Sequence, residues 1–163
     1  MEDEQAKPEL VCEQLRAASW AHFACHASAD MQKLSASCLH LYGTTPDSGD
    51  LRLDAIESLS LQTLDMVVLS ACWAGTPVVL PGNELVGLAS AFLRSGVRRV
   101  VAPLWPVEDS MARSFMADFY AAAARLGPTL AMAAVQREWA ESPDPDVALP
   151  ANWAAYVVYG GCG

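Results

Sequence analysis

Apolar residues occur along this chain in two patterns, as short continuous runs and as longer stretches with helical spacing. The clearest strand is predicted at residues 65–72, because 66–69 are all apolar, as in a strand covered on both faces. The clearest helix is predicted at 84–95, where apolar residues gather on one face and Gly96 follows. The same patterns predict strands at 20–25, 37–42, 51–53, 97–104 and 153–159, and helices at 11–18 and 128–141.

Polar residues and chain breakers set the limits of these segments. Asp54 is expected to cap a helix that runs to residue 59, because its carboxylate can accept the free amide hydrogens of a first turn. For the same reason Asp109 or Ser110 is expected to cap a helix that runs to residue 125. Glycines and prolines predict a turn at 44–50 and loops at 73–82 and 142–150, and residues 1–10 are a solvated lead-in to one domain at 11–163.

Strands and helices alternate in this order, which is typical of a layered α/β fold with a largely parallel sheet. Ligands of such sheets bind beyond the carboxyl ends of the strands. His26 directly follows one predicted strand, and Cys72 ends another. If these two strands are parallel, both side chains lie at the same edge of the sheet.

Composition limits the kind of partner. The chain has 163 residues, 53% of them hydrophobic, which suits one domain with a substantial core. Its net charge of −9 disfavours nucleic acid and anionic membrane surfaces as partners, and a basic peptide fits better. No apolar run approaches the ~18–20 residues of a membrane span, and the acidic first residues do not form a secretory signal.

The cysteines indicate a reducing compartment. There are five, an odd number, and none forms a Cys-x-x-Cys pair, which disfavours both a disulfide framework and a zinc site. No glycine-rich phosphate loop follows any predicted strand, so an α/β module for a small phosphorylated ligand lacks support. We therefore expect a cytoplasmic protein with neither a metal nor a cofactor.

One of these thiols is well placed to react. Cys72 follows the small residues Ser70 and Ala71, which let a substrate approach, and a histidine such as His26 can exchange a proton near neutral pH. Most lone cysteines are small core residues, however, and most lone histidines are structural. His22 and Cys25 compete for the same roles, but they lie inside one predicted strand, on opposite faces. His40 is most simply a surface histidine.

Several segments, in the right order, resemble the motifs of CHAT domains, which are caspase-like peptidases often found after tetratricopeptide repeats. The second histidine of the first motif, here His26, is the catalytic one in that family. The cysteine motif places the nucleophile at Cys72. The matching segments are WAHFACH at 20–26, VVLSACWAG at 67–75, GNELVGLA at 82–89, AFL at 91–93, Gly96, VAPLWPV at 101–107, FY at 119–120 and WAAYVVYG at 153–160.

The resemblance implies a caspase-like three-layer sandwich and a His/Cys dyad that cleaves peptide bonds through an acyl-thioester on Cys72. The backbone amides of Cys72 and Ala27 would form the oxyanion hole. The family usually has Gly where this chain has Ala27, which favours a second interpretation, an inactive pseudopeptidase that binds proteins as a scaffold. CHAT domains also carry more sheet upstream. We therefore expect five or six strands with an exposed edge, and missing strands supplied by another chain or by neighbouring tetratricopeptide-type repeats.

The resemblance also suggests a preference in the substrate. Separase-like relatives cut after basic residues, using an acid that follows their Leu-Trp-x-Val segment. Asp109 is the matching position here, and Glu108 lies beside it. The alternative is that Asp109 only caps the next helix. The expected partner is thus a protein or peptide substrate with a basic residue before the cut.

Overall fold

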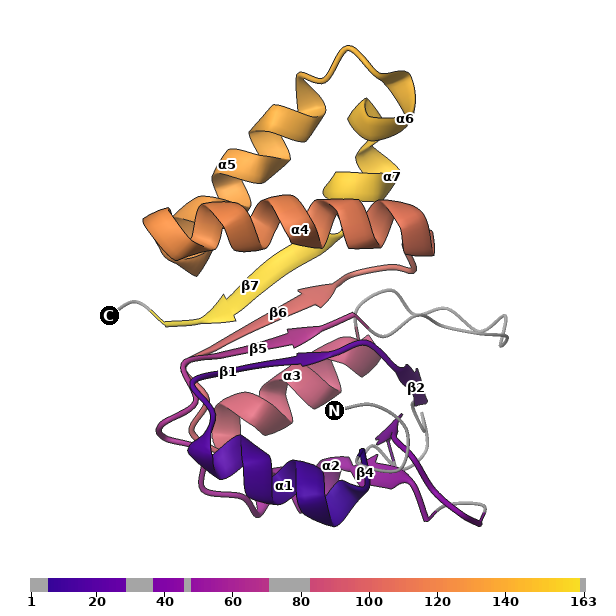
Figure 1. Cartoon of the computed structure of the whole chain (residues 1–163), viewed down its shortest axis with the longest axis vertical. Helices are drawn as coiled ribbons and strands as arrows, with labels where there is room; N and C mark the ends of the chain where they lie inside the picture. Colours follow the sequence, from indigo (N-terminus) through magenta and orange to yellow (C-terminus); the bar gives the residue numbers. More distant parts are fainter. Residues whose placement is uncertain (1–5, 29–36, 46–47, 71–82, 162–163) are drawn as a thin grey trace.

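The main sheet confirms the predicted largely parallel architecture. We analysed a computed structural model of the chain, which describes residues 6–28, 37–45, 48–70 and 83–161 (Figure 1). Within these residues four strands pair in the order β1-β5-β6-β7, fewer than the five or six expected. The first three run parallel and β7 is antiparallel, and β1 forms an edge. Their bounds are β1 Trp20–Phe23, β5 Met66–Leu69, β6 Arg99–Pro103 and β7 Tyr156–Gly160.

A second, smaller sheet contains the histidine that the motif singled out. Its three strands are antiparallel in the order β2-β3-β4 within the described part of the chain. The predicted strand at 20–25 is therefore wrong at its end, because β1 stops at Phe23 and His26 begins a different strand. The chain turns there because β2 finds its backbone partner in β3 rather than in the main sheet. The bounds are β2 His26–Ser28, β3 Cys38–His40 and β4 Asp50–Arg52.

Helices cover both faces of the main sheet, which makes a three-layer sandwich (Figure 1). Strand β5 shows why, because all four of its side chains are fully buried. Val67 and Leu69 pack with α1 and α3 on one face, whereas Met66 and Val68 pack with α4 and α5 on the other. A strand with two apolar faces needs a layer on each side. The fold class predicted from the sequence is thus confirmed.

The helix boundaries differ from the predictions where caps and prolines decide them. Helix α1 begins at Pro8, three residues early, since proline suits a first turn. Helix α2 begins at Leu53 after Arg52, so Asp54 lies inside the first turn and is not the cap. The predicted loop at 142–150 contains α6, and α7 replaces the start of the predicted last strand. The bounds are α1 Pro8–Ala17, α2 Leu53–Glu57, α3 Asn83–Arg94, α4 Asp109–Leu126, α5 Pro128–Ala140, α6 Pro145–Ala148 and α7 Pro150–Trp153.

Among the helices of the described residues, none combines the length and the apolar character that crossing a bilayer requires.

Candidate active site

The parallel pairing of β1 with β5 brings two chain segments to one edge of the sheet. Phe23 and Leu69 are register partners at the carboxyl ends of these strands. The pairing continues one residue further, because the Ser70 amide donates to the Phe23 carbonyl at 2.8 Å. His26 follows Phe23 by three residues, and in the sequence Cys72 follows Leu69 by three. Cys72 itself lies outside the described residues, so its distance from His26 stays a prediction.

A pocket of about 720 Å³ opens at this edge. It lies beyond the carboxyl ends of the parallel strands, where ligands of such sheets bind. Its lining comes from the ends of β1, β5 and β6, from the start of β7, from β2 and β3, and from one face of α4. The polar and aromatic residues among those that line it include His22, His26, His40, Ser70, Asp109, Arg113 and Tyr120.

Ser70 contributes a buried hydroxyl to this wall. Its Oγ atom has no hydrogen-bond partner among the described residues. A buried hydroxyl without a partner costs free energy, so such groups are unusual in a folded core. The motif that precedes Cys72 therefore places a buried hydroxyl without a described partner beside the pocket.

His26 lies on the polar face of the small sheet. Its cross-strand partner is His40, whose own partner on the next strand is Asp50. Neighbouring positions on β2, β3 and β4 alternate between faces, so the opposite face carries Ala27 and its partners, which pack on the apolar core. The row of His26, His40 and Asp50 therefore faces away from that core.

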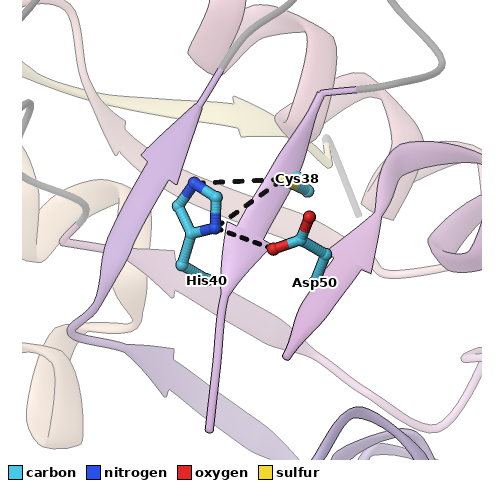
Figure 2. Close-up of side chains that lie close together, drawn as sticks. All are labelled: Cys38, His40 and Asp50. Carbon is cyan, nitrogen blue, oxygen red and sulfur yellow. Dashed lines mark hydrogen bonds and ion pairs between the residues drawn. The ribbon is translucent and has the colours of Figure 1, made fainter. Parts of the chain in front are cut away.

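His40 is a surface histidine, as expected from the sequence. Figure 2 shows that it also lies beside Asp50 and Cys38. Its Nδ1 atom lies 2.8 Å from Asp50 Oδ1, and Cys38 Sγ lies 3.9 Å from the same nitrogen. The imidazole is 41% exposed, whereas the Asp50 side chain is only 12% exposed. Sequence reasoning missed this cluster because its members come from two strands and show no familiar motif spacing.

His22 and Cys25, which competed with His26 and Cys72 in the sequence, line the same pocket, but their pKa values are shifted against these roles. His22 packs its ring against Tyr120, with ring centroids 5.7 Å apart, and loss of solvent lowers the pKa of His22. Cys25 lies beyond the end of β1 rather than inside it. Burial, with a contribution from nearby Cys38, raises the pKa of Cys25 to about 11. Its thiol is therefore protonated at neutral pH and is a poor nucleophile.

Ala27 fits its position without strain. It lies in strand β2, where the extended backbone is open to every residue type, and its methyl group packs against the apolar core. The conformational freedom of glycine is therefore not needed here.

Helix α4 presents one acidic and one basic side chain to the pocket. The residue that caps its first turn is not one that the sequence predicted. Glu108 is the N-cap, and its carboxylate accepts hydrogen bonds from the amides of Ser110 and Met111. Hydrogen bonds from the Ser110 side chain and then from these amides lower the pKa of Glu108. The expectation that Asp109 or Ser110 caps the helix is thus wrong. Asp109 instead lines the pocket, as does Arg113 one turn further along.

Comparisons with known proteins agree with this architecture. The family profile of the CHAT domain matches residues 1–161. Tetratricopeptide repeat protein 28 of Mus musculus is 33% identical over 123 residues, which cover 71% of this chain. The chain spans only about 5% of the length of that protein.

Proposed function

Because the chain belongs to the CHAT domain family, a family of caspase-like proteases, we propose that it is a cysteine endopeptidase with Cys72 as nucleophile and His26 as base. One observation carries the proposal. The register of β1 and β5 brings the segments that lead to these two residues to the same edge of the sheet, where His26 lines a pocket.

In the proposed reaction His26 accepts the proton of the Cys72 thiol, and the sulfur attacks the carbonyl carbon of the scissile bond. The backbone amides of Cys72 and Ala27 donate hydrogen bonds to the oxygen that becomes negative. His26 then donates the proton to the leaving amine, and an acyl-thioester remains on Cys72. Water, deprotonated by His26, hydrolyses this thioester and restores the thiol. The dyad needs neither a metal nor a cofactor.

The position of Asp109 supports a preference for substrates with a basic residue just before the scissile bond. Its carboxylate lies in the pocket wall, and an arginine side chain can pair with a carboxylate through two hydrogen bonds. Arg113 brings an opposite charge to the same wall and weakens this attraction. Glu108 is the weaker candidate contact, because it is not among the residues that line the pocket and its carboxylate already caps α4.

We infer that the peptidase works in the cytoplasm beside tetratricopeptide-type repeats, which the name of the mouse relative mentions. The edge strand β1 suits a partner that adds a strand to the sheet, because its backbone has no neighbour on one side among the described strands. Trp20, on this strand, is 40% exposed. A repeat segment or another chain is the proposed source of that strand.

The proposal is tested with a peptidyl electrophile that alkylates reactive thiols, followed by mass spectrometry of the labelled site. We expect rapid labelling of Cys72 at neutral pH and loss of rapid labelling in His26→Ala. Cys12→Ser is the matched thiol control, because Cys12 lies on α1, away from the pocket lining, and should leave labelling unchanged. Labelling of Cys25 instead, or equal labelling of Cys72 without His26, contradicts the dyad. Labelling without cleavage of any peptide in a library indicates the pseudopeptidase.

A further inference from the structure

The polar face of the small sheet gathers three side chains that commonly bind metals. One ligand atom each from Cys38, His40 and Asp50 lies within 4.8 Å of the other two (Figure 2). Cys38 and His40 share a face of β3 because they are two residues apart, and Asp50 is the cross-strand partner of His40. The pairing of β3 with β4 therefore holds these groups together.

The donor atoms suit zinc among the common metals. A thiolate together with an imidazole selects a borderline-soft ion, whereas magnesium and calcium prefer oxygen ligands only. In tetrahedral zinc sites a sulfur and a nitrogen ligand are about 3.5 Å apart, as follows from the usual zinc–ligand distances. The separation between Cys38 Sγ and His40 Nδ1 is 3.9 Å, so a small rotation of the ring brings both atoms to one ion.

The surroundings leave the cluster accessible on one side. Cys38 is buried, whereas His40 is part of the pocket wall, which provides a path of entry. Arg52 approaches the second oxygen of Asp50 at 3.9 Å and opposes a cation, but Oδ1 faces His40. Ser28 Oγ lies 3.3 Å from Cys38 Sγ and can donate a hydrogen bond to a thiolate there.

The same residues do not form a second nucleophilic triad. Such a triad needs the sulfur near one ring nitrogen while the carboxylate holds the other. Here Cys38 Sγ lies 3.9 Å from Nδ1 and 4.0 Å from Nε2, so it faces neither nitrogen in particular. Burial is also the main cause that raises the pKa of the Cys38 thiol, which disfavours the free thiolate that attack requires.

We propose that Cys38, His40 and Asp50 bind one Zn²⁺ ion, with the fourth position facing the pocket. Cys38 Sγ, His40 Nδ1 and an oxygen of Asp50 are the protein ligands. In the free protein Nδ1 of His40 donates its hydrogen to the Asp50 carboxylate. On binding, the Cys38 thiol releases its proton, and the neutral His40 ring carries its hydrogen on Nε2 instead, which frees Nδ1 for the metal. The expectation of a metal-free protein came from the absence of a Cys-x-x-Cys pair, a spacing that this cross-strand arrangement does not use.

The site lies next to the proposed base. His26 is the cross-strand partner of His40, and both line the same pocket. A bound cation beside His26 should therefore slow thiol labelling at Cys72, a consequence that rests on the proposed function. The binding of zinc itself does not depend on that function.

The test uses the full chain carrying Cys72→Ala, so that the proposed nucleophile cannot supply the thiolate. Zn²⁺ is titrated against a chromophoric chelator, and Co²⁺ is used as a spectroscopic substitute. We expect one ion per chain and a sulfur-to-cobalt charge-transfer band. In this background Cys38→Ser, His40→Gln and Asp50→Asn should each weaken binding by at least about 10–100-fold, the loss that even an outer partner of a metal site causes.

Cys12→Ser and Asp54→Asn are the matched controls, a thiol and a carboxylate outside the cluster, and both should bind zinc as the parent does. Circular dichroism verifies the fold of each variant. If the buried Cys38 cannot be replaced without unfolding the protein, zinc binding by His40→Gln decides the test, because His40 is exposed. Undiminished binding in His40→Gln, the absence of a sulfur-to-cobalt band, or an equal loss in Cys12→Ser overturns the site. If zinc binds as expected but does not slow labelling of Cys72 in the parent chain, the metal site stands and only its link to the proposed base fails.

Discussion

Phe115 joins the helical layer to the sheet, and its removal should be among the most damaging single changes. The side chain is completely buried on α4. Its ring stacks on Tyr156 of β7, with centroids 4.6 Å apart, and meets the edge of Trp139 of α5 at 5.1 Å. Truncation to alanine should cost about 3–5 kcal/mol, because the neighbours on β7 and α5 cannot both close around the space that is left. Domains are stable by only about 5–15 kcal/mol, so this loss is a large fraction of the total.

The free energy of unfolding is measured by urea titration, followed by circular dichroism. Phe115→Ala should lower the urea concentration at the midpoint of unfolding. The dependence of the free energy of unfolding on urea concentration should stay unchanged, since the surface exposed on unfolding is nearly the same. Phe115→Leu retains an apolar side chain and loses the two ring contacts, each worth about 0.5–1.5 kcal/mol, so it should fall between the parent and Phe115→Ala. Leu130→Ala is the control on α5, because that side chain is 65% exposed. A loss below about 1.5 kcal/mol in Phe115→Ala, little more than the average for a point substitution, would refute the packing of this layer.

Three further changes test the pocket and the sheet. Asp109 is exposed in the free protein, and a bound peptide that covers it removes water from its pairing with Arg. Because losing a charge pair desolvated in this way costs about 2–5 kcal/mol, Asp109→Ala should reduce cleavage after Arg by on the order of 30-fold or more and leave cleavage after Met unchanged. Asp54→Ala, which removes an exposed carboxylate outside the pocket lining, is its control in a peptide library, and an equal loss in both variants argues against the pocket role of Asp109. The folded protein disfavours protonated His22, because burial lowers the pKa of this residue. The free energy of unfolding should therefore fall as the pH drops below about 6.5, and it should fall less steeply with pH in His22→Gln. Melting temperatures between pH 7 and 5 measure this pH dependence. The same pH dependence in the parent and in His22→Gln contradicts the lowered pKa of His22. Gly160→Ala should lower the melting temperature, because Gly160 has a φ of +91° and a new methyl carbon would lie 2.5 Å from the Arg98 carbonyl oxygen. A melting temperature equal to that of the parent would contradict this strain at the end of β7.

The sequence by itself determined the layers of this protein. Residues 66–69 are continuously apolar, and such a strand is stable only when both faces are covered. The apolar side of residues 84–95 likewise predicted the helix α3. Each of these features depends on side chains that are close together in the chain, so periodicity is enough to identify them.

Only the tertiary structure decided which residues share a site. The end of β1 at Phe23 and the start of β2 at His26 depend on pairing with β3, which periodicity does not reveal. The contact between His40 and Asp50 joins residues ten positions apart through strand register. Glu108 rather than Asp109 caps α4 because the backbone turns into the helix one residue earlier than local preference indicates. Register and chain direction are set by packing between distant segments, and for that reason the cluster on the small sheet could not be read from spacing alone.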